Sequence, residues 1–304
     1  MKLLARKVNN YSLYASHAWY VPGVKGMFGL LGWFILGNLL AIVVQAIFSA
    51  FIPMDLVQKY SMLVLYPLSF IPAMIYVGQQ SQRNSLFETG YKLSSNNFGR
   101  FKGWLIALVT VALTFATMIS ADLPNYWNYK LTTLIPGMES FYELLTKVMR
   151  ELTGGPFWSS FLLVAIFAPI FEEWLCRGMV LRGLLANLKP GWAIVVSALF
   201  FALIHANPWQ ALNAFIIGVV MGYVYYKTGN LWLTMLMHFV NNGTAVILSQ
   251  FSSLQEMEFW MDVLPKSTYT IVYVCGLVLL CACLWVFRSI PLAQKRGNID
   301  TVEL

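Results

Sequence analysis

Long apolar runs separated by short polar connections dominate this chain. A membrane-spanning helix needs about 20 predominantly apolar residues, and eight segments reach or approach that length. They are Met27–Ile52, Ser61–Val77, Trp104–Ser120, Phe157–Leu185, Gly191–Ala206, Gln210–Tyr226, Leu231–Leu248 and Tyr269–Phe287. The fifth is short, and the fourth is long and interrupted by charge. The pattern predicts an all-α, polytopic membrane helical bundle with about eight transmembrane helices.

The connections divide this single membrane domain into three parts. Residues 1–156 hold three spans and a long polar connection from Asp122 to Pro156, in which Phe141–Arg150 has the pattern of a short amphipathic helix. Residues 157–250 contain the polar residues discussed below and form the predicted catalytic core. Residues 251–304 hold the last span and a polar tail.

Composition supports a membrane environment and excludes a nucleic-acid partner. Of the 304 residues, 59% are hydrophobic and only 11% are charged, whereas soluble proteins have about 25% charged residues. The net charge of +7 comes from basic clusters between apolar segments, without a basic face of interleaved aromatics. Membrane lipid is therefore the expected partner of these clusters.

The basic clusters also predict the orientation. They lie in the N-terminal arm, after the second, fourth and sixth spans, and after the last, whereas the other connections are acidic or mixed. Because cytoplasmic loops carry an excess of Lys and Arg, both termini should face the cytoplasm. The compact chain and this topology fit a bacterial inner membrane.

Two adjacent carboxylates, Glu172 and Glu173, interrupt the fourth span. Each charge costs about 2.5–3.5 kcal/mol at the centre of a membrane helix, unless the span ends at Phe171 and the acids lie among the headgroups. Glu173 and Arg177 are four residues apart and can pair on one helix face. Glu172 lies about 100° away around the helix, so it is free for another role.

Two of the three histidines lie in later spans. His205 ends the fifth and shares a helix face with Phe201, while His238 lies in the seventh and shares a face with Asn242. A lone membrane histidine is explained equally well as a packing residue bonded to a neighbouring helix. Counted from the basic ends, however, Glu172 and these polar groups lie at overlapping depths of about 12–22 Å. We therefore predict one shared polar cavity.

Three motifs resemble those of the CPBP family, the group of type II CAAX prenyl proteases and Abi-like intramembrane proteases. They are Glu172-Glu-Trp-Leu-Cys-Arg177 for Glu-Glu-x-x-x-Arg, Phe201-Ala-Leu-Ile-His205 for Phe-x-x-x-His, and His238-Phe-Val-Asn-Asn242 for His-x-x-x-Asn. Each motif alone is weak, but their order on membrane spans is specific. The resemblance covers about Phe157 to Leu248. It implies an eight-helix bundle with a cytoplasm-facing cavity, and cleavage near prenylated or otherwise membrane-held C-termini.

The resemblance also implies roles for the site residues. Glu172 and His205 would activate the attacking water, and His238 and Asn242 would stabilise the oxyanion. The supporting residues would be Glu173, Arg177 and Phe201. Cys176 is a minor candidate for a nucleophile, because it lies only about 40° from the direction of Glu172.

The sequence does not decide whether the site binds a metal ion. Glu172, His205 and His238 form a two-histidine, one-carboxylate set, which is also the ligand set of a catalytic zinc. The common zinc-protease signature His-Glu-x-x-His is absent from the sequence. We therefore expect either one divalent metal, zinc, or no cofactor.

The favoured function is an intramembrane endopeptidase acting on a peptide or protein with a membrane-associated, in some hosts lipidated, C-terminus. Prenylated substrates suit a eukaryotic host, and peptide processing or bacteriocin self-protection suits a bacterium. One alternative is a non-enzymatic immunity or scaffold protein that keeps the polar cluster for binding or folding. Another is a proton-coupled transporter, although the inverted repeats and paired broken helices of transporters are not visible.

Overall fold

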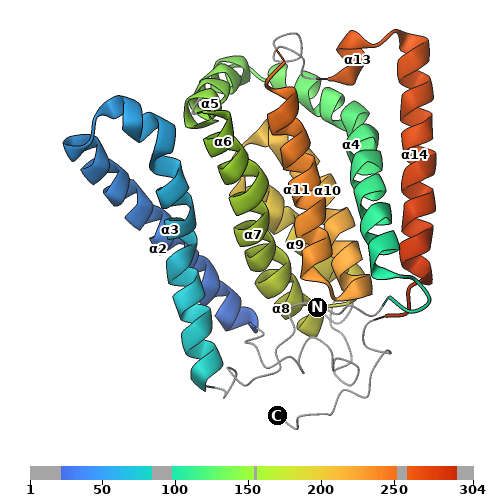
Figure 1. The fold of residues 1–304 in the computed structure, drawn as a ribbon, viewed down its shortest axis with the longest axis horizontal. Coiled ribbons are helices and arrows are strands. Elements are labelled where there is room, and N and C mark those ends of the chain that lie inside the picture. The colour runs from blue at the N-terminus through green and yellow to red at the C-terminus, as the bar shows by residue number, and fades with distance from the viewer. Residues whose placement is uncertain (1–21, 84–97, 154–155, 252–258, 293–304) are drawn as a thin grey trace.

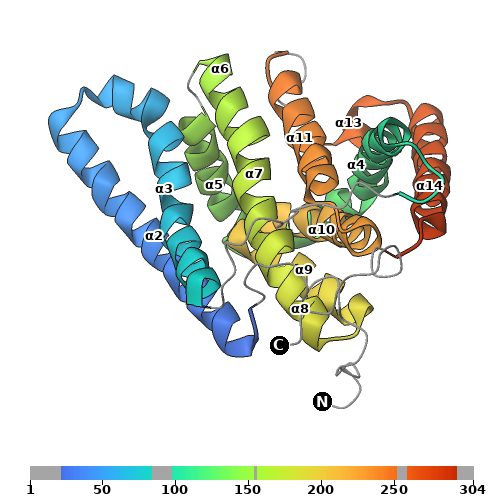
Figure 2. The same ribbon diagram turned by 60° about the horizontal axis from the view of Figure 1, so that its bottom comes forward.

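The computed structural model describes residues 22–83, 98–153, 156–251 and 259–292, and its regular elements are helices. Two N-terminal helices, α2 (Val24–Phe51) and α3 (Met54–Arg83), form an antiparallel hairpin. This hairpin leans away from the remaining helices at one end of the molecule (Figures 1 and 2). The tail beyond residue 292 and the basic N-terminal arm lie outside the described residues.

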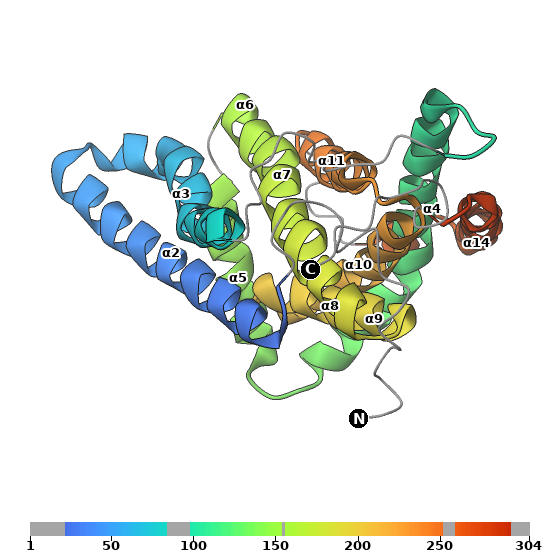
Figure 3. The same ribbon diagram turned by 90° about the horizontal axis from the view of Figure 1, so that it is seen from below.

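A long central helix runs through the bundle from Phe157 to Asn187. It consists of α6 (Phe157–Ser160), the π-helical stretch η2 (Phe161–Phe167), α7 (Ala168–Glu173), a second π-helical stretch η3 (Trp174–Leu181) and α8 (Arg182–Asn187). Seen from below, it lies between the α2–α3 hairpin on one side and most of the remaining helices on the other (Figure 3). π-Helical turns inside α-helices are frequent at functional sites, and here they flank the two glutamates.

The remaining helices pack beside this central helix. They are α4 (Gly103–Thr133), α5 (Met138–Thr153), α9 (Pro190–Ile204), α10 (Pro208–Thr228), α11 (Leu231–Leu248), the short α13 (Trp260–Val263) and α14 (Lys266–Ser289). α9 and α10 form an antiparallel pair with close backbones, because a Cβ atom at Gly218 would come within 3.1 Å of Ala198. Asn207 begins α10 by accepting hydrogen bonds from the backbone of Trp209 and Gln210.

Six helices of the described residues are long and apolar enough to cross a membrane. They are Val24–Phe51, Met54–Gln80, Gly103–Thr133, Phe157–Asn187, Leu231–Leu248 and Lys266–Ser289. Each corresponds to a predicted span, so the all-helical membrane architecture is confirmed. The other two predicted spans form α9, an apolar helix of only 15 residues, and α10. The count of eight crossings and the orientation of the termini therefore stay predictions.

The long polar connection predicted from Asp122 to Pro156 is mostly helical, and only its amphipathic helix was predicted. α4 continues through Asp122 to Thr133, and α5 covers and extends the predicted amphipathic helix. Asp122 can stay in the helix because its carboxylate accepts hydrogen bonds from the Trp260 backbone N–H and the Tyr269 hydroxyl, at 3.1 and 2.9 Å. Distant partners thus satisfy the polar groups that suggested a loop.

The two ends of the bundle differ in charge. One end, the basic end, carries Lys25, Lys102, Lys189, Lys227 and Arg288 at or beside the helix termini. The opposite end, the mixed end, contains the α2–α3 turn, α5 and α13, and carries charges of both signs: Asp55, Lys59, Lys130, Glu139, Glu143, Lys147, Asp262 and Lys266. In Figure 1 the basic end is at the bottom, next to α8, and the mixed end is at the top.

Candidate active site

The two adjacent glutamates of the central helix face different surroundings. Glu173 is fully buried and forms an ion pair with Arg177, whose Nη1 lies 2.5 Å from Glu173 Oε1. This pair confirms the contact predicted from their spacing. Arg177 also donates to the carbonyl of Gly218 on α10, at 3.2 Å, so that it joins the central helix to the α9–α10 pair.

Glu172 points toward α3 and toward both histidines. Its Oε1 accepts a hydrogen bond of 2.5 Å from the Tyr66 hydroxyl on α3. Its Oε2 is buried, has no hydrogen-bond partner among the described residues, and lies 4.0 Å from Nε2 of both His205 and His238. The predicted convergence of Glu172 with the two imidazoles is therefore present. Tyr66, in a span with no recognisable motif, was not predicted.

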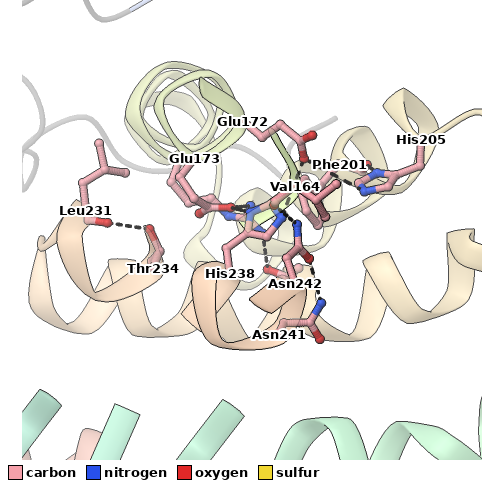
Figure 4. A network of polar contacts seen from close by, with 12 residues as sticks. Val164, Glu172, Glu173, Phe201, His205, Leu231, Thr234, His238, Asn241 and Asn242 are labelled. Carbon is pink, nitrogen blue, oxygen red and sulfur yellow. Dashed lines mark hydrogen bonds and ion pairs between the residues drawn. The ribbon is translucent and has the colours of Figure 1, made fainter. Parts of the chain in front are cut away.

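The contact made by Nδ1 of each imidazole determines which ring nitrogen carries the proton. His205 Nδ1 lies 2.7 Å from the carbonyl oxygen of Phe201, and His238 Nδ1 lies 3.1 Å from Glu173 Oε1 (Figure 4). A carbonyl or carboxylate oxygen only accepts, so Nδ1 is the donor in both contacts. In the neutral ring, Nε2 then presents a lone pair toward Glu172.

The space between these groups suits one water molecule. Glu172 Oε2 and His205 Nε2 both accept hydrogen bonds, so the 4.0 Å gap between them needs a molecule with two protons. A water making two hydrogen bonds of about 2.8 Å can bridge groups about 4–4.6 Å apart. Such a water would keep its lone pairs free for a substrate carbonyl.

Phe201 supports both histidines from one side. Its ring makes edge-to-face contacts with His205 and His238, with centroids 4.8 and 5.5 Å apart. The Arg177 guanidinium carbon lies 4.4 Å from the centroid of the same ring, a separation that allows a cation–π interaction. The predicted supporting residues therefore form one contact network around the histidines.

Asn242 is held by the central helix rather than left free. Its Nδ2 donates to the Val164 carbonyl at 2.9 Å, and its Oδ1 accepts from Asn241 Nδ2 at 3.0 Å. In η2 the Ala168 N–H bonds to Leu163, and Pro169 has no N–H to offer Val164. Asn242 thus supplies a hydrogen bond that the helix backbone lacks, and one of its two amide protons remains for another partner.

Glu172 borders two cavities. One, of about 440 Å³, is lined by Glu172, both histidines and Asn242, together with the amide side chains of Gln210, Asn213 and Asn241. The other, of about 600 Å³, lies against α2 and α3 and also reaches Glu172 and His205. Met62 and Tyr66 line both. We call Glu172, His205, His238 and Asn242 the Glu172 cluster. A substrate in either cavity would therefore contact at least two members of this cluster.

Two further predicted roles receive less support. Cys176, the minor nucleophile candidate, is fully buried in the core on the basic-end side of the glutamates. The described residues include no group of three His, Cys, Asp or Glu side chains placed to hold a metal ion. Tetrahedral zinc ligands lie about 3.4 Å apart when the bonds are 2.0–2.1 Å long, which is closer than the 4.0 Å separations at Glu172.

Comparison with known proteins adds one finding to this geometry. Residues 154–244 match the family model of type II CAAX prenyl endopeptidases, Rce1-like. The chain carries an Rce1-like segment. This segment contains Glu172, His205, His238 and Asn242, whereas Tyr66 lies outside it. No curated protein and no solved structure matches the chain.

Proposed function

We propose that this protein is an intramembrane endopeptidase that hydrolyses peptide bonds with a water activated by Glu172 and His205. One observation carries the proposal. The free Oε2 of Glu172 lies 4.0 Å from two imidazole nitrogens, at the border of cavities inside a bundle of apolar helices. The Rce1-like match over 154–244 supports the same class of reaction.

The proposed reaction begins with the bridging water. Its two protons bond to Glu172 Oε2 and His205 Nε2, and its oxygen attacks the scissile carbonyl carbon as one proton passes to Glu172. The resulting tetrahedral intermediate collapses when the C–N bond breaks and the leaving amine takes up a proton from Glu172. Tyr66 holds Oε1 of the same carboxylate, which keeps Oε2 directed at the water.

His238 and Asn242 are the proposed donors to the oxyanion. Because His238 donates through Nδ1 to Glu173, it can donate through Nε2 only as an imidazolium. This role therefore requires a proton on both ring nitrogens of His238. Asn242 contributes the amide proton that Val164 does not use. A well-placed donor is worth about 2.7–4 kcal/mol in the transition state.

The proposed mechanism contains no step through a metal. Glu172, His205 and His238 are chemically suitable zinc ligands, but their present separations suit a water better. The test is direct: if cleavage is lost with a chelator and restored by zinc, and the purified protein contains zinc in a one-to-one ratio, this part of the proposal is wrong.

The proposed substrate is a peptide or protein segment held in the membrane, in some hosts by a lipid. We place both termini in the cytoplasm, because the basic end carries the positive charge expected of cytoplasmic loops. The proposed location is a bacterial inner membrane, which this topology fits.

Purified protein in proteoliposomes, mixed with a membrane-tethered fluorogenic peptide library, tests the activity. We expect cleavage by the wild type and none above background by Glu172→Ala or His205→Ala, while thermal unfolding shows all three proteins folded. Normal cleavage by both variants would rule out the assigned site.

A further inference from the structure

Among the described residues, the 440 Å³ cavity beside Glu172 is lined from Glu172 toward one end of the bundle. Its wall includes Val164 near the start of the central helix, Gln210 and Asn213 near the start of α10, and Ala245 near the end of α11. These three helix termini all lie at the mixed end. The cavity therefore occupies the half of the bundle between Glu172 and the mixed end.

The second cavity lies in the same half. It reaches from Glu172 and Tyr66 along α2 and α3 to Gln45, Met54 and Gln58, close to the α2–α3 turn. The hairpin leans away from the central helix at this end, as Figure 2 shows. The larger cavity also includes Phe34 and Phe70, which lie at the level of Phe171 beside Glu172. From this level both described cavities extend toward the mixed end.

Toward the basic end, the central helix is closed in by packing. Every residue from Glu173 to Leu185 is buried, including the fully buried Arg177, Met179 and Leu181. These residues form cores with α9, α10 and α11. Protein interiors have few voids larger than a water molecule, so a peptide cannot pass through this half to Glu172.

We propose that substrate reaches Glu172 from the mixed end, and that this end faces away from the cytoplasm. The site would then act on peptides whose scissile bond lies in the outer half of the bilayer, such as membrane-held segments of exported peptides. The proposal rests on the endopeptidase function proposed above and on the charge difference between the ends. It differs in this respect from the cytoplasm-facing cavity that the family resemblance implies.

The wall of the 440 Å³ cavity suits an extended peptide. Gln210, Asn213 and Asn241 offer amide donors and acceptors between the mixed end and Glu172. Asn125 Nδ2 donates to Asn213 Oδ1 at 3.1 Å. This bond fixes the orientation of the Asn213 amide and leaves the N–H groups of Asn213 for another acceptor. An unpaired peptide group in an apolar medium is costly, and these side chains can satisfy it while the peptide unwinds for cleavage.

Cysteine labelling tests the direction of access. In a background with Cys176, Cys275, Cys281 and Cys283 replaced by Ala, single cysteines are placed in the cavity as Met62→Cys and Ala245→Cys. Matched controls report the two ends, Lys189→Cys for the basic end and Ser140→Cys for the mixed end; both native residues are exposed. A membrane-impermeant maleimide is then applied to spheroplasts and to inverted vesicles.

The inference predicts that both cavity cysteines and Ser140→Cys react in spheroplasts, whereas Lys189→Cys reacts only in inverted vesicles. Three results would overturn it. The cavity cysteines could react from the same side as Lys189→Cys, the two controls could exchange sides, or the cavity cysteines could fail to react from either side.

A pair of reporters separates this inference from the proposed function. The same single-span peptide is built with its cleavable segment in the outer or in the cytoplasmic half of the bilayer. We expect cleavage of the outer reporter alone, and its loss in Glu172→Gln. Cleavage of only the cytoplasmic reporter would overturn the direction of access and leave the protease function standing. If neither reporter were cleaved in a Glu172-dependent way while the labelling held, the protease function would fail instead.

Discussion

Removing one hydroxyl group from α3 should slow cleavage without unfolding the protein. The substitution is Tyr66→Phe, which deletes the donor to Glu172 Oε1 and keeps the ring. That ring packs against Phe70, with centroids 5.4 Å apart, and this contact is available to phenylalanine as well. Without the donor, the carboxylate can rotate and Oε2 is no longer directed at the water.

The magnitude follows from the type of hydrogen bond. A bond to a charged group contributes about 1.5–3 kcal/mol, and a factor of ten corresponds to about 1.4 kcal/mol. If the whole contribution is used to position Glu172, kcat should fall by about 10- to 150-fold. KM should change little, because the cavity keeps its shape.

The assay is steady-state cleavage of a tethered peptide in proteoliposomes, with thermal unfolding measured on the same samples. Tyr60→Phe is the matched control, since Tyr60 lies on the same helix and its ring stacks on Trp158 rather than contacting Glu172. It should cleave at the wild-type rate.

A second measurement distinguishes positioning from a general structural effect. In a Glu172→Gln background, Tyr66→Phe should cause no further loss, because residues acting through one another are not additive. A full additional loss in that background would refute the reasoning, and so would a Tyr66→Phe rate within twofold of the wild type.

Three further predictions concern neighbours of the site. Arg177→Ala removes the ion-pair partner of the fully buried Glu173 and leaves its carboxylate with the His238 contact, which should destabilise the protein by about 3–5 kcal/mol; denaturant or thermal unfolding in detergent would measure this, and an unchanged midpoint would contradict it. Asn242→Ala removes a proposed oxyanion donor and should lower kcat by about 10²–10³; a change in KM alone would show a binding role. Cys176→Ala should cleave within about threefold of the wild type, because the thiol is buried in the core; complete loss in a folded variant would reinstate a cysteine nucleophile.

The sequence predicted those parts of the site that depend on helical spacing. The Glu173–Arg177 pair follows from a separation of four residues, and the different direction of Glu172 follows from the angle of about 100° between successive residues of a helix. For His205, His238 and Glu172, the sequence predicted only that their depths in the membrane overlap. Depth does not fix rotation about the helix axes, so the two 4.0 Å contacts required the structure.

Contacts between distant helices were not predictable from local patterns. Tyr66 is 106 residues from Glu172, and one tyrosine in an apolar span has no periodicity that marks its partner. The length of α4 was missed for the same reason, since Asp122 finds its partners 138 and 147 residues away at Trp260 and Tyr269. A buried polar group stabilises or ends a helix according to its partners, which local sequence does not reveal.

A comparison of two adjacent isosteric substitutions tests the central claim most directly. The rate of peptide cleavage is measured for Glu172→Gln and Glu173→Gln, together with their thermal unfolding. We predict that Glu172→Gln unfolds at the wild-type temperature but loses at least about 100-fold in kcat, the size of a general-base contribution. Glu173→Gln should unfold earlier, because Arg177 loses its buried partner. If Glu172→Gln cleaves within a few-fold of the wild type, Glu172 does not activate the water and the account is wrong.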